Sequence, residues 1–296
     1  MSAQFPIVSK SLMAISPGIF CRISPPATIQ PAPNSLDMNP IENLWCAFKQ
    51  KVMTVNVFTH QQLIDKAKHV WTTDRQLAVN QNRPGDLKES FNVTSFKKQK
   101  KWPEEVPEFK IVMLKFFHMM ANLSLRILRL IAIGLKLDNP SFFQQFHSCF
   151  SEENMSNLRT LQYPSLTGKE IKLNQIRCGE HCDFGTITVL FQDETGGLEV
   201  LNKENEFIPV TPKPGLALVN IGTLMQKWSD NRLIATMHRV VAPKDDKFQR
   251  TERRSLAFFL YPDYSFTIKS PLNDDDEPIN AGDYANMKFA QIYGKR

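Results

Sequence analysis

From about residue 157 onward, the chain is a series of short apolar runs separated by turn residues, and this pattern constrains the fold more than any other feature. Turn-forming clusters at 194–197 and 212–215 are examples of the separators. Short, evenly spaced strands with turns between them are typical of antiparallel barrels and jelly rolls. We therefore predict a mainly β protein with flanking helices, whose core is a double-stranded β-helix (jelly roll) over residues 155–270. The predicted strands are LRTLQYP, EIKLNQIRC, TITVLFQ, LEVLN, LALVNIG, LIATMHRVVA and SLAFFLYP.

The rest of the chain divides by composition. Residues 1–36 are rich in proline and serine and contain no Asp or Glu, so we expect disorder there. Residues 37–81 carry helical patterns, and residues 82–154 indicate a polar connector followed by a long helix and then a shorter one in SFFQQFHSCF. Residues 271–296 form a C-terminal tail.

The longest apolar stretch, residues 109–137, is interrupted by basic side chains. Placing each of these cations at the centre of a bilayer would cost about a few kcal/mol. The stretch therefore predicts an amphipathic helix packed on a protein core and no membrane span. The interrupting residues are Lys115, His118, Arg126 and Arg129.

The charge and the cysteine content indicate which partners and which cellular compartment to expect. The net charge of +6 is modest, and its clearest cluster, KKQKK at 97–101, is typical of a solvated loop, so we do not expect nucleic-acid binding. The five cysteines are odd in number and irregularly spaced, which indicates a reducing, cytoplasmic setting. We expect a monomer that acts on a small molecule.

The triplet HCD at 181–183 places an imidazole and a carboxylate two positions apart. Residues two apart on a strand share a face, so His181 and Asp183 can bind one ion while Cys182 points away. His238, in LIATMHRVV, is the third ligand we predict, on the face that Ile234 and Thr236 share. Two imidazoles and a carboxylate on one side of a metal form the facial triad of non-haem iron(II) oxygenases.

The last predicted strand alternates in the same way. Arg253, Ser255, Ala257 and Phe259 fall on one face of it. A guanidinium binds a carboxylate through two parallel hydrogen bonds, and a neighbouring hydroxyl adds a third.

Residues 82–264 resemble the iron(II)- and 2-oxoglutarate-dependent oxygenases, in the branch that includes isopenicillin N synthase. The resemblance is strongest in NLRTLQYPSL, RCGEHCDFGTITVLFQDETGGLEV, LVNIGTLMQKWSD, TMHRVVAP and RRSLAFFLYPD. It implies Fe(2+), 2-oxoglutarate and O2 as cofactors, with ascorbate as a possible reductant. In that family 2-oxoglutarate is decarboxylated to succinate while a small organic molecule is hydroxylated or otherwise oxidised.

The same resemblance implies roles for residues beyond the triad. Arg253 and Ser255 would hold the distal carboxylate of 2-oxoglutarate. Tyr163, before Pro164, would support the same molecule or, in the oxidase branch, the substrate. We expect Phe184 and Phe259 to shape the substrate cavity.

Two alternatives stay open. Residues 30–72, with NSLDMNPIENLW, resemble the C-terminal end of mariner-type transposases, and Glu42 matches the third catalytic carboxylate of that family. Two-metal chemistry needs further carboxylates, and residues 1–36 contain none, so we expect no nuclease activity. In this first alternative the chain is a truncated chimera of an oxygenase with a transposase fragment. Its barrel edge would be exposed and its catalysis impaired. The other alternative is an iron oxidase that does not use 2-oxoglutarate, for which Leu161 leaves room.

Overall fold

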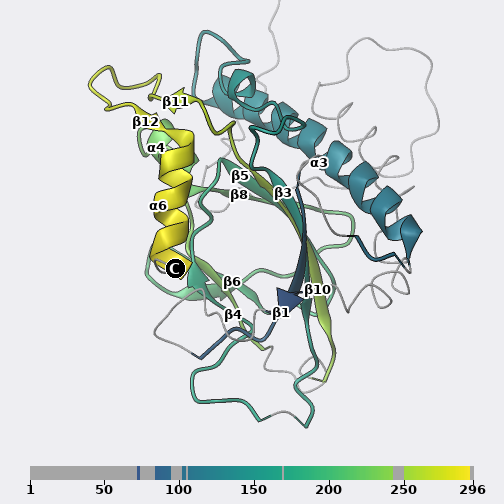
Figure 1. Ribbon diagram of the computed structural model, residues 1–296. Coiled ribbons are helices and arrows are strands. Elements are labelled where there is room, and N and C mark those ends of the chain that lie inside the picture. The colour runs from purple at the N-terminus through teal and green to yellow at the C-terminus, as the bar shows by residue number, and fades with distance from the viewer. Residues whose placement is uncertain are drawn as a thin grey trace, which may run out of the picture.

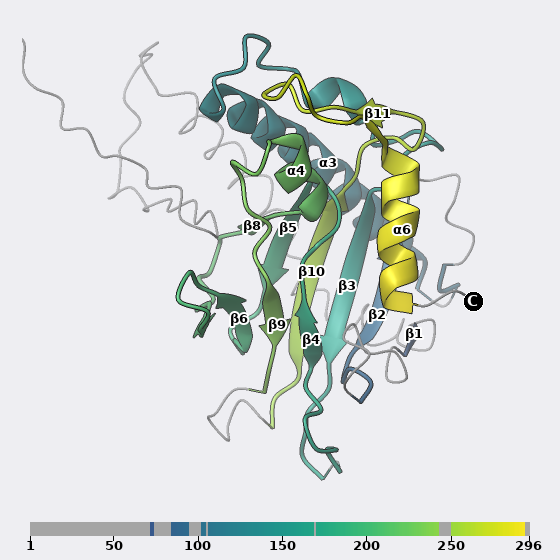
Figure 2. The same cartoon turned by 90° about the vertical axis from the view of Figure 1, so that its left-hand side faces the viewer.

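The computed structural model describes residues 72–73, 84–94, 102–104, 106–168, 170–242 and 250–293. Within these residues, two antiparallel β-sheets face each other and enclose a cavity, while a long helix covers the outer face of the larger sheet (Figure 1). Figure 2 shows the strands of both sheets running along the same general direction. The predicted fold class, a mainly β protein with flanking helices, is confirmed.

The larger sheet has six strands in the order β1-β2-β3-β10-β5-β8. Its two longest strands, β3 and β10, pair side by side, so that Arg253 lies opposite Tyr163 and Phe259 lies opposite Asn157. The bounds are β1 Thr72–Thr73, β2 Glu89–Val93, β3 Asn157–Tyr163, β5 Ile187–Gln192, β8 Leu218–Ile221 and β10 Arg253–Leu260.

The smaller sheet has four strands in the order β4-β9-β6-β7. Strands β4 and β9 bring His181 opposite His238, and the register shifts between Cys178 and His181. The bounds are β4 Cys178–His181, β6 Leu198–Leu201, β7 Phe207–Pro209 and β9 His238–Val240.

Helix α3, Pro107–Gly134, confirms the predicted apolar helix. Nine of its side chains are buried, and rings on it pack edge-on against the larger sheet, with Phe117 5.2 Å from Phe258 and Phe116 5.5 Å from Phe191. By length and composition α3 is the one helix among the described residues that could cross a membrane, but a core helix has the same composition.

The larger sheet extends beyond β3 on the side away from β10. Strand β2, where we predicted a connector, pairs with β3 from Glu89 opposite Gln162 to Val93 opposite Leu158. Thr72–Thr73 then pair with β2. In the chimera alternative this side of the barrel would lack strands, but LKESFNV supplies one, so β3 is not the edge strand. The two-residue strand at 72–73 lies within residues 37–81, where we expected helices.

Several predicted elements differ from the structure. Residues 170–177 form turns and loop, not a strand, and 233–237 lead into the three-residue β9 without being strand themselves. SFFQQFHSCF forms only the 3-10 turn η3, Gln144–Phe146, among other turns. The predicted tail, residues 271–296, contains β12 Ile279–Asn280 and α6 Ala281–Tyr293. Within the predicted core lie β11 Thr267–Ile268, which pairs with β12, and α4 Thr223–Trp228.

The predictions for residues 1–36, for the helical remnant up to residue 71, for Glu42 and for the lysine run at 97–101 lie outside the described residues.

Candidate metal centre and adjoining cavity

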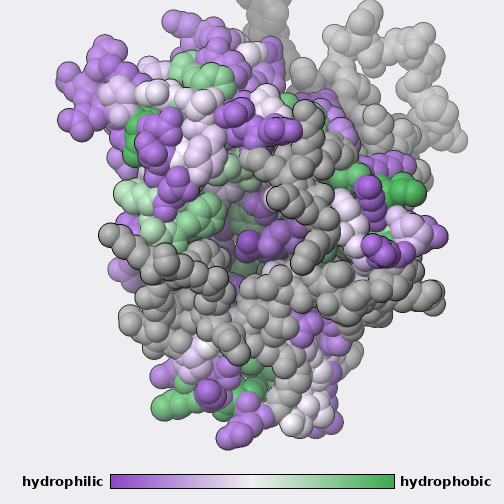
Figure 3. Space-filling view, in the orientation of Figure 1, coloured by the Kyte–Doolittle hydropathy of each residue, from purple (hydrophilic) through white to green (hydrophobic). Residues whose placement is uncertain are grey.

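A cavity lies between the two sheets, and it collects most of the predicted site residues. The inner face of β3 and β10 forms one wall, β4 and β9 form the opposite wall, and α6 adds Phe289. Figure 3 shows a hollow in this face of the molecule with hydrophilic side chains inside it. The predicted residues that line the cavity are Tyr163, His181, Asp183, Phe184, His238, Arg253, Ser255 and Phe259.

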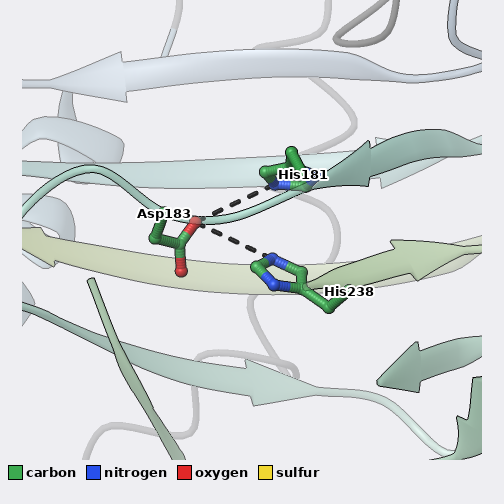
Figure 4. Close-up of side chains that lie close together, drawn as sticks. All are labelled: His181, Asp183 and His238. Atoms are coloured by element: carbon green, nitrogen blue, oxygen red, sulfur yellow. Dashed lines mark ion pairs between the residues drawn. The ribbon is translucent and has the colours of Figure 1, made fainter. Parts of the chain in front are cut away.

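The two predicted imidazoles and the carboxylate point toward one another (Figure 4). Asp183 Oδ1 lies 3.8 Å from His181 Nε2 and 3.7 Å from His238 Nε2. One ligand atom from each residue lies within 4.8 Å of the others, and this is the one such group of three among the described residues. The spacing matches three ligands arranged around one side of a single ion.

Backbone carbonyls fix both imidazole rings. His181 Nδ1 lies 2.8 Å from the Gly179 carbonyl oxygen, and His238 Nδ1 lies 3.1 Å from that of Thr236. A carbonyl only accepts, so each Nδ1 carries the proton and each Nε2 presents a lone pair. This is how proteins orient histidine ligands of metals.

The carboxylate is held from the other side. Asn220 Nδ2 donates to Asp183 Oδ2 at 2.8 Å, which leaves Oδ1 facing the two Nε2 atoms. The backbone N–H of Thr223 donates to the Asp183 carbonyl at 2.8 Å. A Cβ on Gly222 would overlap the carbonyl of Gly185, so only glycine allows the chain after β8 to approach the Asp183 loop this closely.

Electrostatics favour the metal-binding protonation states. Burial lowers the pKa of His181, against the opposing effect of Asp183, and burial followed by His181 lowers the pKa of His238. Burial opposes ionisation of Asp183, but the two histidines and Asn220 outweigh it and lower the pKa of that carboxyl. Near neutral pH the cluster therefore consists of two neutral imidazoles and one carboxylate.

The convergence has a different cause from the one we predicted. Strand β4 ends at His181, so Asp183 sits in the following loop and strand alternation does not place it. Strand β9 begins at His238, and before it Ile234 is 49% exposed while Thr236 is buried, so strand alternation does not place these three residues on one face. The β4–β9 pairing and the loop at Asp183 bring the three together.

The predicted alternation on the last strand is confirmed, since Arg253, Ser255, Ala257 and Phe259 all line the cavity. Arg253 is 1% exposed. Its Nη1 donates to Ser255 Oγ at 3.3 Å, and its guanidinium lies 4.7 Å from the centroid of the Tyr163 ring. Burial raises the pKa of the Tyr163 hydroxyl, against the opposing effects of the neighbouring Arg253 and Ser255.

Aromatic side chains border the other end of the cavity. The ring of Phe184 packs edge-on against Phe289 of α6, with centroids 5.9 Å apart. The guanidinium of Arg159 lies 5.3 Å from the centroid of Phe259. Cys182 is among the residues that line the cavity, but its thiol donates to the Ala235 carbonyl and it is not part of the three-ligand group, which confirms the prediction that it points away from the ion.

Sequence reasoning missed several site residues. Lys88 lines the cavity from the residue before β2, and Arg177, just before β4, is fully buried next to Arg253. The Nε and Nη1 groups of Arg177 have no hydrogen-bond partner among the described residues. Phe289 comes from the part we treated as a tail. The sequence did offer one signal for Lys88. It is a charged residue directly before β2, the strand that pairs with β3 and therefore with Tyr163.

Comparison with known proteins agrees with this geometry. A family model described as the 2OG-Fe(II) oxygenase superfamily matches residues 152–262. The 2-oxoglutarate-dependent dioxygenase htyE of Aspergillus rugulosus is 33% identical over 229 residues, which cover 71% of this chain and 68% of htyE. The chain belongs to the 2OG-Fe(II) oxygenase superfamily.

Individual relatives extend the comparison. The 2-oxoglutarate-Fe(II) type oxidoreductase ppzD of Metarhizium rileyi is 34% identical over 225 residues, and the match covers 71% of this chain but only 62% of ppzD. A full-length Neurospora crassa protein, solved in complex with alpha-KG, superposes with a TM-score of 0.66 and 27% identity, covering 87% of this chain and 85% of the Neurospora chain. A second structure of that Neurospora protein contains alpha-KG and thymine.

Proposed function

We propose that this chain is an iron(II)- and 2-oxoglutarate-dependent oxygenase that hydroxylates or otherwise oxidises a small organic molecule. The observation that carries the proposal is the set of three oriented ligand atoms beside a buried arginine in one cavity. Family membership supports the same conclusion.

The side chains present fit an iron(II) ion. Imidazole nitrogen and carboxylate oxygen are the donors of the two-histidine, one-carboxylate iron sites. The Nε2 atoms of His181 and His238 and Oδ1 of Asp183 are the atoms that would hold the ion. With iron(II), O2 and 2-oxoglutarate bound, such a centre couples decarboxylation of 2-oxoglutarate to succinate with oxidation of a substrate C–H bond.

Arg253 would bind the distal carboxylate of 2-oxoglutarate. Its charge is buried, and among the described residues no carboxylate lies within ion-pair distance of it. Ser255 Oγ and the Tyr163 hydroxyl lie beside it as further hydrogen-bonding groups. Together they orient the co-substrate with its keto-acid end toward the triad.

Phe184 and Phe259 would form the substrate-binding part of the cavity. Both line it, and their apolar rings exclude water from the neighbourhood of the triad. Phe184 packs on Phe289, so α6 belongs to the same wall. The thymine bound in one structure of the Neurospora relative supports a small organic molecule as the substrate class.

The assay that tests the function needs no known substrate. Purified protein receives iron(II), ascorbate and 2-oxoglutarate labelled at the carboxylate that is lost. We expect slow release of labelled CO2 with equal amounts of succinate, and no release from the His181→Ala variant. A folded protein that binds iron and 2-oxoglutarate but releases no CO2 would contradict the proposal and favour the oxidase that works without 2-oxoglutarate.

We further propose a cytoplasmic monomer without affinity for nucleic acid. The three described cysteines are free, which supports a reducing setting. For residues 30–72 we keep the proposal of a mariner-type transposase remnant, which rests on the motif NSLDMNPIENLW alone. A transcript that spans residues 70–90 tests whether the two parts are made as one chain.

A further inference from the structure

Lys88 is a buried ammonium that faces the cavity and that no predicted role uses. The residue is 4% exposed. Its Nζ donates to Asp86 Oδ2 at 2.8 Å and to Cys178 Sγ at 3.2 Å. Asp86 Oδ1 also accepts a hydrogen bond from the Gly179 N–H at 3.0 Å, so the pair connects the start of β2 to β4.

The strand register puts Lys88 in line with the predicted co-substrate residues. Glu89 pairs with Gln162, so Lys88, one residue earlier, lies beside Tyr163, one residue later. Tyr163 pairs in turn with Arg253. Lys88, Tyr163 and Arg253 therefore stand at the same end of three adjacent strands, and all three line the cavity.

The charge of Lys88 is maintained although it is buried. Burial disfavours the ammonium, but the Asp86 carboxylate, whose Oδ2 lies 2.8 Å from Nζ, stabilises it, and the pKa of Lys88 stays above its ordinary value. Burial raises the pKa of the Cys178 thiol to about 11, so that thiol is neutral near pH 7 and Asp86 is the counter-ion.

An ammonium has three N–H donors, and the described residues use two of those of Lys88. The third is left for an acceptor inside the cavity. A buried ion pair contributes little to stability compared with apolar side chains of the same size. Cross-linking β2 to β4 is thus a weak reason for placing a charge at this position, whereas an oxyanion ligand is a strong one.

We propose that Lys88 is a further binding residue for the 2-oxo acid co-substrate, donating its free N–H to a carboxylate oxygen beside Tyr163 and Arg253. The substrate would bind beside the aromatic side chains at the other end of the cavity, so it would not compete for Lys88, Tyr163 and Arg253. Asp86 is the positioning residue, since it aims the ammonium through its own bond to Gly179. This inference rests on the proposed function.

The test measures 2-oxoglutarate affinity by titration calorimetry on protein loaded with Mn(II), which fills the metal site without turnover. The main variant is Asp86→Asn/Lys88→Met, which removes both charges and leaves no unpaired buried carboxylate. We expect about tenfold weaker 2-oxoglutarate binding, because a charge-assisted hydrogen bond is lost. Mn(II) affinity and the melting temperature should stay near those of the wild type. Lys203→Met, which removes an exposed lysine, is the matched control and should change nothing.

The outcomes separate the inference from the function it rests on. If the double variant binds 2-oxoglutarate within about twofold of the wild type, Lys88 is not a co-substrate residue. If wild-type protein itself fails to bind 2-oxoglutarate, the proposed function fails. If the double variant does not fold, Lys88→Gln takes its place, since the amide keeps a donor for Asp86 but carries no charge. It should show a similar loss, and unchanged binding would overturn the inference.

Discussion

Replacing Arg253 by leucine is the most informative perturbation of the co-substrate site. The guanidinium is buried and donates to three neutral oxygens. These are the Gly196 carbonyl at 2.8 Å, Ser255 Oγ at 3.3 Å and Gln192 Oε1 at 3.1 Å. A guanidinium has five N–H groups, so two remain for a ligand. The positive charge itself has no counter-ion among the described residues.

The expected magnitude follows from this burial. Removing one partner of a buried ion pair costs about 3–5 kcal/mol. In the variant, the hydroxyls of Ser255 and Tyr163 remain near the distal carboxylate of 2-oxoglutarate. We therefore take the lower end of this range, about 3 kcal/mol. At about 1.4 kcal/mol per tenfold change, Arg253→Leu should weaken 2-oxoglutarate binding roughly a hundredfold.

Calorimetric titration of 2-oxoglutarate into Mn(II)-loaded protein measures this directly. Arg250→Leu is the control, because it removes an exposed guanidinium three residues upstream. It should bind 2-oxoglutarate like the wild type. A folded Arg253→Leu protein whose affinity for 2-oxoglutarate falls less than about threefold would refute the assignment of Arg253.

Three further predictions concern the metal, the core and acid stability. His181→Ala and His238→Ala should each abolish iron retention in metal analysis after gel filtration; a full equivalent of iron in either protein would contradict the triad. Phe117→Ala should lower the free energy of unfolding by about 3–5 kcal/mol in urea titration, because Phe117 is 1% exposed and packs on Phe258. A loss below about 1 kcal/mol would mean that α3 contributes little to the core. Burial lowers the pKa of His147 to about 4 against 6.5 in the unfolded chain, so the unfolded state gains a proton first. Stability should therefore fall as pH drops from 6.5 to 4, by about 3 kcal/mol from this group. His147→Gln should show a smaller fall, and an equal one would count against the buried neutral imidazole.

Local patterns predicted the ligands and the strands of the core well. Alternation in β10 placed Arg253, Ser255 and Phe259 on one face because that strand is long and regular. The apolar run after residue 107 forms α3 as predicted, because the spacing of its apolar residues and its length favour a helix independently of tertiary contacts.

The positions of Asp183, Lys88 and α6 depend on tertiary contacts, which local sequence patterns do not predict. Asp183 approaches the histidines through a loop whose path depends on the crossing of Gly185 and Gly222, and no periodicity encodes that crossing. Lys88 lies beside Tyr163 only because β2 pairs with β3, a contact between segments about 70 residues apart. The helix at 281–293 was missed although Ala281, Tyr284 and Ala285 are buried at helical spacing, and Phe289 of the same helix packs against Phe184.

The most direct measurement of the central idea is a crystal structure of the protein grown with Mn(II) and 2-oxoglutarate, with the ion located by anomalous scattering. We predict one strong peak within bonding distance of the two Nε2 atoms and the aspartate oxygen of the cluster. A peak at some other group of side chains, with these three left without an ion, would contradict the account.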